Sequence, residues 1–180
     1  MKRIRHLVGL AVVVAALSHF VTVWAAPYVL MDGAMKRISR NGTLVNQWSH
    51  PPRTSVKSRT VVRPSPDLAY SACVYDLAEG PVRVTASAWD DYMSVSVFAH
   101  NSDNIFVIND RQARSGVDLT IVRKGAPHPA GVQLVVESPS RRGIVLQRRV
   151  APTQERFNAA AAARANDHCG VIPASEGDRS

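Results

Sequence analysis

Aromatic residues are scarce in this 180-residue chain and make up only 6% of it. The formal net charge is nevertheless +8 at pH 7, a value that alone would be compatible with nucleic-acid binding. Surfaces that bind nucleic acids gather their cations in patches and often add aromatic side chains that stack on bases. The arginines here are spread along the chain, so we expect no nucleic-acid partner and predict anionic lipid or another acidic surface of the cell envelope as the electrostatic partner.

The motifs of easily recognised enzyme classes are also missing. The chain contains no G-x-S-x-G nucleophile elbow, no H-E-x-x-H zinc motif, no phosphate-binding loop of the Walker type and no dinucleotide fingerprint. The histidines lie far apart, and only the adjacent pair His168 and Cys169 offers two metal ligands at close spacing. We therefore predict no metal site and no cofactor, and we favour a non-catalytic protein.

One long apolar run is present near the N-terminus. Residues 7–31 carry no formally charged side chain and follow the basic leader MKRIRH. About 20 apolar residues cross the hydrocarbon layer of a bilayer, so we predict that residues 1–31 form a membrane anchor. A cleaved signal peptide is the alternative, because Val23-Trp24-Ala25 loosely fits a small-x-small cleavage site. We favour the anchor because apolar residues continue past that point.

A short amphipathic stretch follows, and we assign residues 32–53 to a juxtamembrane helix and a linker. Its apolar side chains recur at helical spacing, and its cations fall on or near the other side of the helix. The apolar residues are Met31, Ala34, Met35 and Ile38, and the cations are Lys36, Arg37 and Arg40. A helix with this pattern just outside a membrane span can lie along the lipid headgroups.

Short extended runs, separated by Pro, Gly, Asn and Asp, predict an antiparallel β domain over residues 54–150. In the segment MSVSVFA, residues Met93, Val95 and Val97 share one face of a strand, and the two serines share the other. Such a strand is expected to be half buried. The predicted strands are Thr54–Val62, Ala69–Leu77, Val82–Ala88, Tyr92–Ala99, Ile105–Ile108, Val117–Arg123, Val132–Glu137 and Gly143–Val150.

An alanine-rich segment predicts a C-terminal helix within residues 151–169, because alanine is the best helix former. Thr153 fits the N-cap position, and Glu155 would lie in the positively polarised first turn. Residues 170–180 are short and polar, and we expect them to form a flexible tail.

The chain has only two cysteines, Cys73 and Cys169. If the domain is exported, an even cysteine count favours a disulfide, which would hold the C-terminal helix against the β domain. Closing a loop on the order of 100 residues stabilises a fold by about 4 to 5 kcal/mol at most in the loop-entropy model. The alternative is two buried free thiols that act as small hydrophobic side chains.

Two polar clusters are candidates for binding or catalysis. One lies between two predicted strands and the other just after the next strand, so a hairpin could bring them together to hold a polar ligand such as a sugar or to perform acid–base chemistry. The candidate residues are His100, Asp103, Asn104, Asp110 and Arg111. The alternative, which we favour, is that the Asn and Asp side chains cap turns and that Asp110 pairs with a nearby arginine.

Four segments together resemble the bacterial family known as domain of unknown function 1254, in a short membrane-anchored form. They are RPSPDLAYSACVYDL (Arg63–Leu77), EGPVRVTA (Glu79–Ala86), YMSVSVFAHNSDNIFVINDRQ (Tyr92–Gln112) and SPSRRGIVLQRRV (Ser138–Val150). Each motif is weakly specific because it consists of strand and turn residues, but the order and spacing of the four are more specific.

The resemblance implies an all-β fold, namely an immunoglobulin-like antiparallel β-sandwich, here with an N-terminal transmembrane helix and a C-terminal α-helix. It implies no established activity, so no catalytic residue can be carried over. Members of the family are often encoded beside, or fused to, a second β domain of the type called domain of unknown function 1214. We therefore expect a module of the bacterial cell membrane, with its β domain on the periplasmic or extracytoplasmic side and a separate β-domain protein as its partner. An enzyme subunit or a sugar-binding protein is the alternative.

Overall fold

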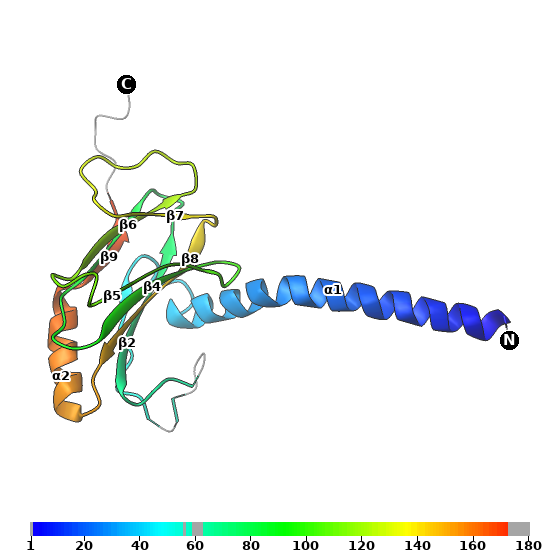
Figure 1. Ribbon diagram of the computed structural model, residues 1–180, viewed down its shortest axis with the longest axis horizontal. Coiled ribbons are helices and arrows are strands. Elements are labelled where there is room, and N and C mark those ends of the chain that lie inside the picture. Colours follow the sequence, from blue (N-terminus) through cyan, green and yellow to red (C-terminus); the bar gives the residue numbers. More distant parts are fainter. Residues whose placement is uncertain (1, 56, 59–62, 173–180) are drawn as a thin grey trace.

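The structure is a computed structural model that describes all residues except 1, 56, 59–62 and 173–180. A long helix leads into a two-layered β domain, and a short helix lies against the side of this domain far from the N-terminus (Figure 1). In chain order the elements are α1 (Lys2–Ile38), β1 (Trp48–Ser49), β2 (Leu68–Asp76), β3 (Val82–Ala86), β4 (Met93–Ala99), β5 (Asn104–Asn109), β6 (Val117–Arg123), β7 (Val135–Ser138), β8 (Arg142–Val150), α2 (Gln154–Ala163), the 3-10 turn η1 (Arg164–Asn166) and β9 (His168–Val171).

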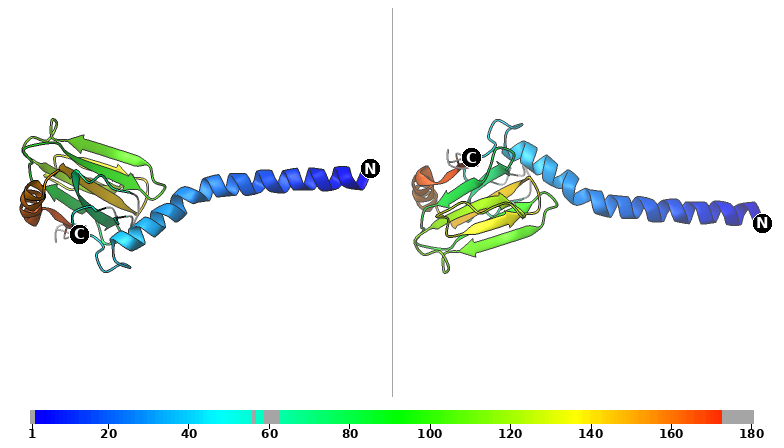
Figure 2. Two further views of the ribbon diagram at one scale, coloured as in Figure 1. Left: turned by 90° about the horizontal axis from the view of Figure 1, so that it is seen from below. Right: turned by 90° about the horizontal axis from the view of Figure 1, so that it is seen from above.

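The strands form two sheets that face each other across one core (Figure 2). The five-stranded sheet has the order β1-β2-β8-β4-β5, and the four-stranded sheet has the order β7-β6-β3-β9. Alternating side chains of both sheets fill the space between them, among them Val95, Val97, Val84 and Leu119, all fully buried. The predicted alternation in β4 is correct for its valines, which point into this core. The expectation that the strand is half buried is wrong, because Ser94 and Ser96 on its other face are only 2% and 1% exposed. These small side chains lie between the larger side chains of the neighbouring strands β8 and β5.

The predicted all-β antiparallel class is only partly right. Strands β6 and β7 pair in parallel, so the four-stranded sheet is mixed, whereas the pairs of the five-stranded sheet are antiparallel. Two helices flank the sheets, and α1 alone contains 37 residues. The described architecture is therefore two facing β-sheets with a long apolar helix before them and a short helix after β8.

Two short edge strands were not predicted, and one predicted strand differs from the structure. Both β1 and β9 are too short to show an alternating pattern and owe their conformation to pairing with β2 and β3. Within the predicted strand Thr54–Val62, the described residues are not extended into a strand: Ser58 N–H donates to Ser55 O at 2.9 Å. Serine side chains that bond to nearby backbone favour such turns. The rest of that prediction lies outside the described residues.

The C-terminal helix begins as predicted. The Thr153 side chain accepts a hydrogen bond from Arg156 N at 3.1 Å, so Thr153 is the N-cap of α2. The helix itself covers Gln154–Ala163, and the chain then continues through η1 into β9 rather than remaining helical to residue 169. The short strand takes over because its backbone pairs with β3.

A disulfide joins Cys73 and Cys169, whose Cα atoms are 6.6 Å apart, so the predicted pairing is confirmed and free thiols are excluded. Cys73 lies in β2 of the five-stranded sheet, and Cys169 lies in β9 of the four-stranded sheet. The bond therefore links the two sheets directly. It holds the last strand, rather than the end of a helix, against the rest of the domain.

Helix α1 is continuous through Pro27, and its first part projects away from the β domain (Figures 1 and 2). By length and composition this helix is sufficient to cross a membrane. Its last turns pack on the outer face of the five-stranded sheet, where Met31 and Met35 contact a cluster that includes Val74 and Ile144. The predicted amphipathic face is present, but the interpretation that it can lie on lipid headgroups is wrong for these residues. Burying both methionines against the sheet removes their apolar surface from water, which stabilises this packing.

Candidate functional site

The structure places the two predicted polar clusters at opposite ends of β5. His100 and Asp103 belong to the turn before this strand, Asn104 is its first residue, and Asp110 and Arg111 follow its last residue. A strand of six residues at about 3.3 Å per residue separates the clusters by roughly 20 Å. The hairpin therefore does not bring them together into one site.

The cluster after β5 makes the contacts of a turn. Asp110 Oδ1 accepts a hydrogen bond from Met93 N at 3.4 Å, and Arg111 N donates to Asn109 Oδ1 at 3.0 Å. The first bond reaches the start of β4, 17 residues away, and the second is a local side-chain contact to backbone of the kind typical of Asn in turns. Among the described residues Asp110 forms no ion pair, so the expected pairing with a nearby arginine is not found. Any role of Asp110 or Arg111 in ligand binding stays a prediction.

The cluster before β5 holds helix α1. His100 Nε2 lies 2.8 Å from Asp32 Oδ1, and the His100 ring meets the Tyr28 ring edge-on at 5.4 Å between centroids. In the same turn, Ser102 Oγ donates to Pro27 O at 3.1 Å. Asp103 accepts a hydrogen bond from the Asn101 side chain, which keeps the turn closed. This site is a junction between the helix and the β domain.

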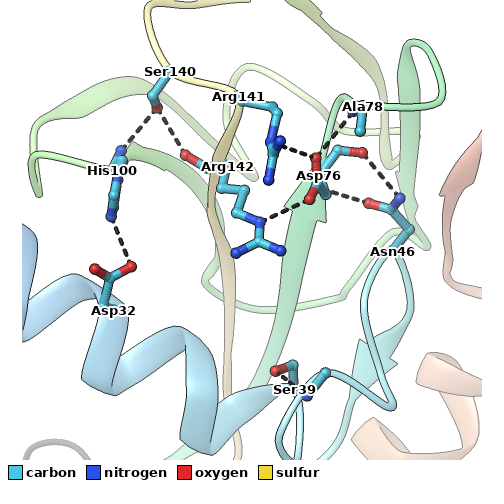
Figure 3. A network of polar contacts seen from close by, with 10 residues as sticks. Asp32, Ser39, Asn46, Asp76, Ala78, His100, Ser140, Arg141 and Arg142 are labelled. Atoms are coloured by element: carbon cyan, nitrogen blue, oxygen red, sulfur yellow. Dashed lines mark hydrogen bonds and ion pairs between the residues drawn. The ribbon is translucent and has the colours of Figure 1, made fainter.

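A network of polar contacts continues from this junction across the end of the sheet (Figure 3). His100 N donates to Ser140 Oγ at 2.9 Å, and Ser140 Oγ donates to Arg142 O at 2.8 Å. The Arg142 guanidinium then reaches Asp76 at 2.7 Å, and Arg141 lies 3.3 Å from the same carboxylate. The orientation of α1 is thus tied to the ends of β2 and β8.

A second polar site, which sequence reasoning missed, is an ion pair buried between the sheets. Arg149 on β8 and Asp167 before β9 have side chains that are 1% and 0% exposed, and their closest atoms are 2.9 Å apart. Asp167 also accepts hydrogen bonds from Ser87 N at 2.7 Å and from Gln147 Nε2 at 2.9 Å. Burial alone would raise the pKa of Asp167, but these three donors together lower it below its usual range.

This buried ion pair adjoins an open pocket of about 570 Å³ next to the disulfide. The pocket is lined by Gln47, Trp48, His50, Ala161, Arg164, Ala165, Asp167, His168 and Cys169. His50 Nδ1 lies 2.9 Å from the hydroxyl of the buried residue Ser71, and desolvation followed by the charge of Arg164 lowers the pKa of His50.

One sequence signal could have indicated this site. Val145, Gln147 and Arg149 alternate along β8, so they point to the same face, and Val145 belongs to the core. A glutamine and an arginine in register with a core valine require buried partners. Nothing in the local pattern identifies Asp167 as the partner, because it lies 18 residues further along the chain.

An apolar groove of about 600 Å³ lies on the other side of the five-stranded sheet. The end of α1 forms one wall with Met31, Ala34 and Ile38, while Phe98 and Leu146 belong to the sheet. His100 and Asp110 line neither this groove nor the polar pocket. The two hollows are thus built from residues other than the five candidates.

The fold and its sites define a two-sheet β domain that is closed by an inter-sheet disulfide and follows a long apolar helix. The chain belongs to the family described as protein of unknown function (DUF1254), whose model matches residues 45–171. The resemblance inferred from the four sequence segments is therefore confirmed. A search of curated proteins finds no match to the chain.

Two solved structures are similar to this chain at low sequence identity, and the first of them shares its fold. The crystal structure of the VPA0106 protein from Vibrio parahaemolyticus matches with a TM-score of 0.62 and 14% identity, over 83% of this chain and 36% of that one. A putative uncharacterized protein from Burkholderia cenocepacia matches with a TM-score of 0.47 and 15% identity, over 76% of this chain and 37% of that one. The present chain thus spans little more than a third of the length of either protein.

Proposed function

We propose that this protein is a non-catalytic, membrane-anchored module of the bacterial cell envelope that assembles with a separate β domain. Helix α1 is its contact with membrane lipid, and the β domain lies on the periplasmic or extracytoplasmic side. The disulfide between Cys73 and Cys169 supports this location, because disulfides persist in oxidising compartments. The domain is an immunoglobulin-like sandwich in this proposal, an assignment supported by the bond between its two sheets.

The apolar groove beside α1 is the observation that carries the proposal. Exposed apolar surface on a sheet is typical of a site for another protein. The groove is also held in a defined shape, because Met31 and Met35 of α1 are buried against the sheet and Ser102 Oγ donates to Pro27 O. We propose that a β domain of the type called domain of unknown function 1214 covers it, with no nucleic acid involved.

The length of the solved relative supports the same view. The fold occupies 36% of the Vibrio parahaemolyticus chain, so it occurs there as one portion of a longer protein. The alternative, an enzyme subunit or sugar-binding protein, required a concave pocket that holds His100 or Asp110. These residues line neither hollow, and we therefore favour the module.

Capture from native membranes tests the proposal. The tagged full-length protein is purified from its own membranes, and co-purifying chains are identified by mass spectrometry. We expect a β-domain protein of the 1214 type, whose recovery falls at least tenfold in Leu146→Asp because a carboxylate is placed in the groove.

Tyr92→Asp is the matched control, since Tyr92 is an exposed apolar residue that does not line the groove. It should leave the recovery unchanged. Circular dichroism confirms that both variants fold. Absence of any β-domain partner, or equal recovery with both variants, would overturn the proposal.

A further inference from the structure

The buried charges beside the disulfide do not balance. Arg149 and Asp167 neutralise each other. Arg164 is only 6% exposed and adds a second guanidinium to the pocket that Asp167 also lines. Its side chain donates to Tyr70 O at 2.9 Å and packs over the Phe157 ring, and no carboxylate of the described residues forms an ion pair with it. A buried cation without a counterion is costly unless an anion compensates it.

The pocket next to Arg164 presents donors and no unoccupied carboxylate. Both oxygens of Asp167 already accept hydrogen bonds, Oδ1 from Ser87 N and Oδ2 from Gln147 and Arg149. Two buried donors of the lining residues, Trp48 Nε1 and Arg164 Nε, have no acceptor among the described atoms. Buried donors of this kind normally have a partner, which can be protein, water or ligand.

The volume of this open pocket suits a small molecule. Its volume of about 570 Å³ falls within the range of roughly 300 to 1,000 Å³ that is usual for ligand sites. The lining residues Gln47, His50 and His168 are exposed, so the pocket is open to solvent. Trp48 and His50 stack with 6.3 Å between ring centroids and offer a flat wall for a ring-shaped ligand.

We propose that this pocket binds a small organic carboxylate, with the carboxylate group on Arg164 and the remainder of the ligand against Trp48. The guanidinium matches the planar geometry of a carboxylate, and the surplus positive charge favours an anion. This ligand site is independent of the β-domain partner, which occupies the opposite side of the five-stranded sheet.

Thermal unfolding of the full-length protein in detergent tests the proposal. Glucuronate is the probe, because it joins a carboxylate to a ring, and glucose, acetate and phosphate are compared at constant ionic strength. Binding to the folded state raises Tm in a saturable way. We expect this for glucuronate, more weakly for acetate, and not for glucose.

Three variants locate the effect. Arg164→Gln should weaken glucuronate binding about tenfold to hundredfold, the loss expected for a hydrogen bond to a charged group. Arg83→Gln, which removes an exposed guanidinium paired with Asp118, should leave binding unchanged. His50→Glu places a carboxylate in the lining of the pocket. This variant should have a higher Tm without ligand and show no further Tm shift with glucuronate. It keeps the test valid if Arg164→Gln does not fold.

A Tm shift that is the same in the wild type and in His50→Glu would overturn the proposal. So would the absence of any shift with glucuronate and acetate, or a response to phosphate alone, which would indicate an inorganic oxyanion site.

Discussion

The Asp167→Asn substitution removes the charge that neutralises Arg149 without changing the size of the side chain. Arg149 is 1% exposed and Asp167 is 0% exposed, so water cannot replace the lost carboxylate. Asp167 now accepts hydrogen bonds from Arg149, Gln147 and Ser87 N. The NH2 group of an asparagine is itself a donor, so it would face at least one of these donors without forming a hydrogen bond. Removing one partner of a buried ion pair costs about 3–5 kcal/mol of unfolding free energy, and we expect a value in this range.

The assay is urea unfolding of the disulfide-intact protein in detergent, followed by tryptophan fluorescence. Asp118→Asn is the matched control, because Asp118 pairs with Arg83 at 2.6 Å while both side chains are more than half exposed. That exposed pair should contribute about 0–1 kcal/mol. If the two substitutions lower the unfolding free energy equally, the buried ion pair of Arg149 and Asp167 contributes no more than an exposed pair, and the reasoning is refuted.

The same comparison has a defined pH dependence. The pKa of Asp167 is lowered in the folded protein, so the unfolded chain takes up a proton first as the pH falls. The carboxylate therefore makes its full contribution to stability at pH values well above 3.8, the ordinary pKa of an aspartate. This contribution is lost as the pH falls through the lower pKa that Asp167 has in the folded protein. The difference between the wild type and Asp167→Asn should shrink below about pH 4.

Three further predictions concern other parts of the molecule. Replacing Cys73 and Cys169 together by alanine should lower the unfolding free energy by up to about 4 to 5 kcal/mol in denaturant titrations, and thiol labelling of the denatured, non-reduced wild type should find no reactive thiol. The mature protein should retain residues 1–31 and resist carbonate extraction; an intact mass that places the mature N-terminus near residue 26 would contradict the anchor. His100→Ala or Asp110→Ala should each lower the unfolding free energy by about 1 kcal/mol or less and leave partner binding intact. If the wild type shows measurable turnover and either substitution abolishes it without unfolding the protein, an enzyme is favoured instead.

Much of the architecture could be predicted because it depends on local patterns. The uninterrupted apolar run predicts a helix, and α1 extends from Lys2 to Ile38. Alternation in MSVSVFA predicts a strand with its valines in the core, and β4 has them there, although its serine face is buried as well. Thr153 was recognised as an N-cap because capping involves only the next few residues. The pairing of the two cysteines followed from their number and from the expected compartment.

Other features depend on residues that are distant in sequence, and these could not be predicted. Asp167 becomes the partner of Arg149 only when β9 is docked beside β3, and α1 meets Ala72 and Ile144 only after β2 and β8 have paired. The candidate residues around His100 and Asp110 are close in sequence, but the length of β5 separates them in space. Sequence alone indicated the helices and most strands, since these follow from short-range periodicity and composition. It favoured the disulfide only because the chain has two cysteines and an expected oxidising compartment. Tertiary structure decided which charges are buried together, where the hollows lie and what the amphipathic face of α1 contacts, because these depend on how the two sheets and the helix pack.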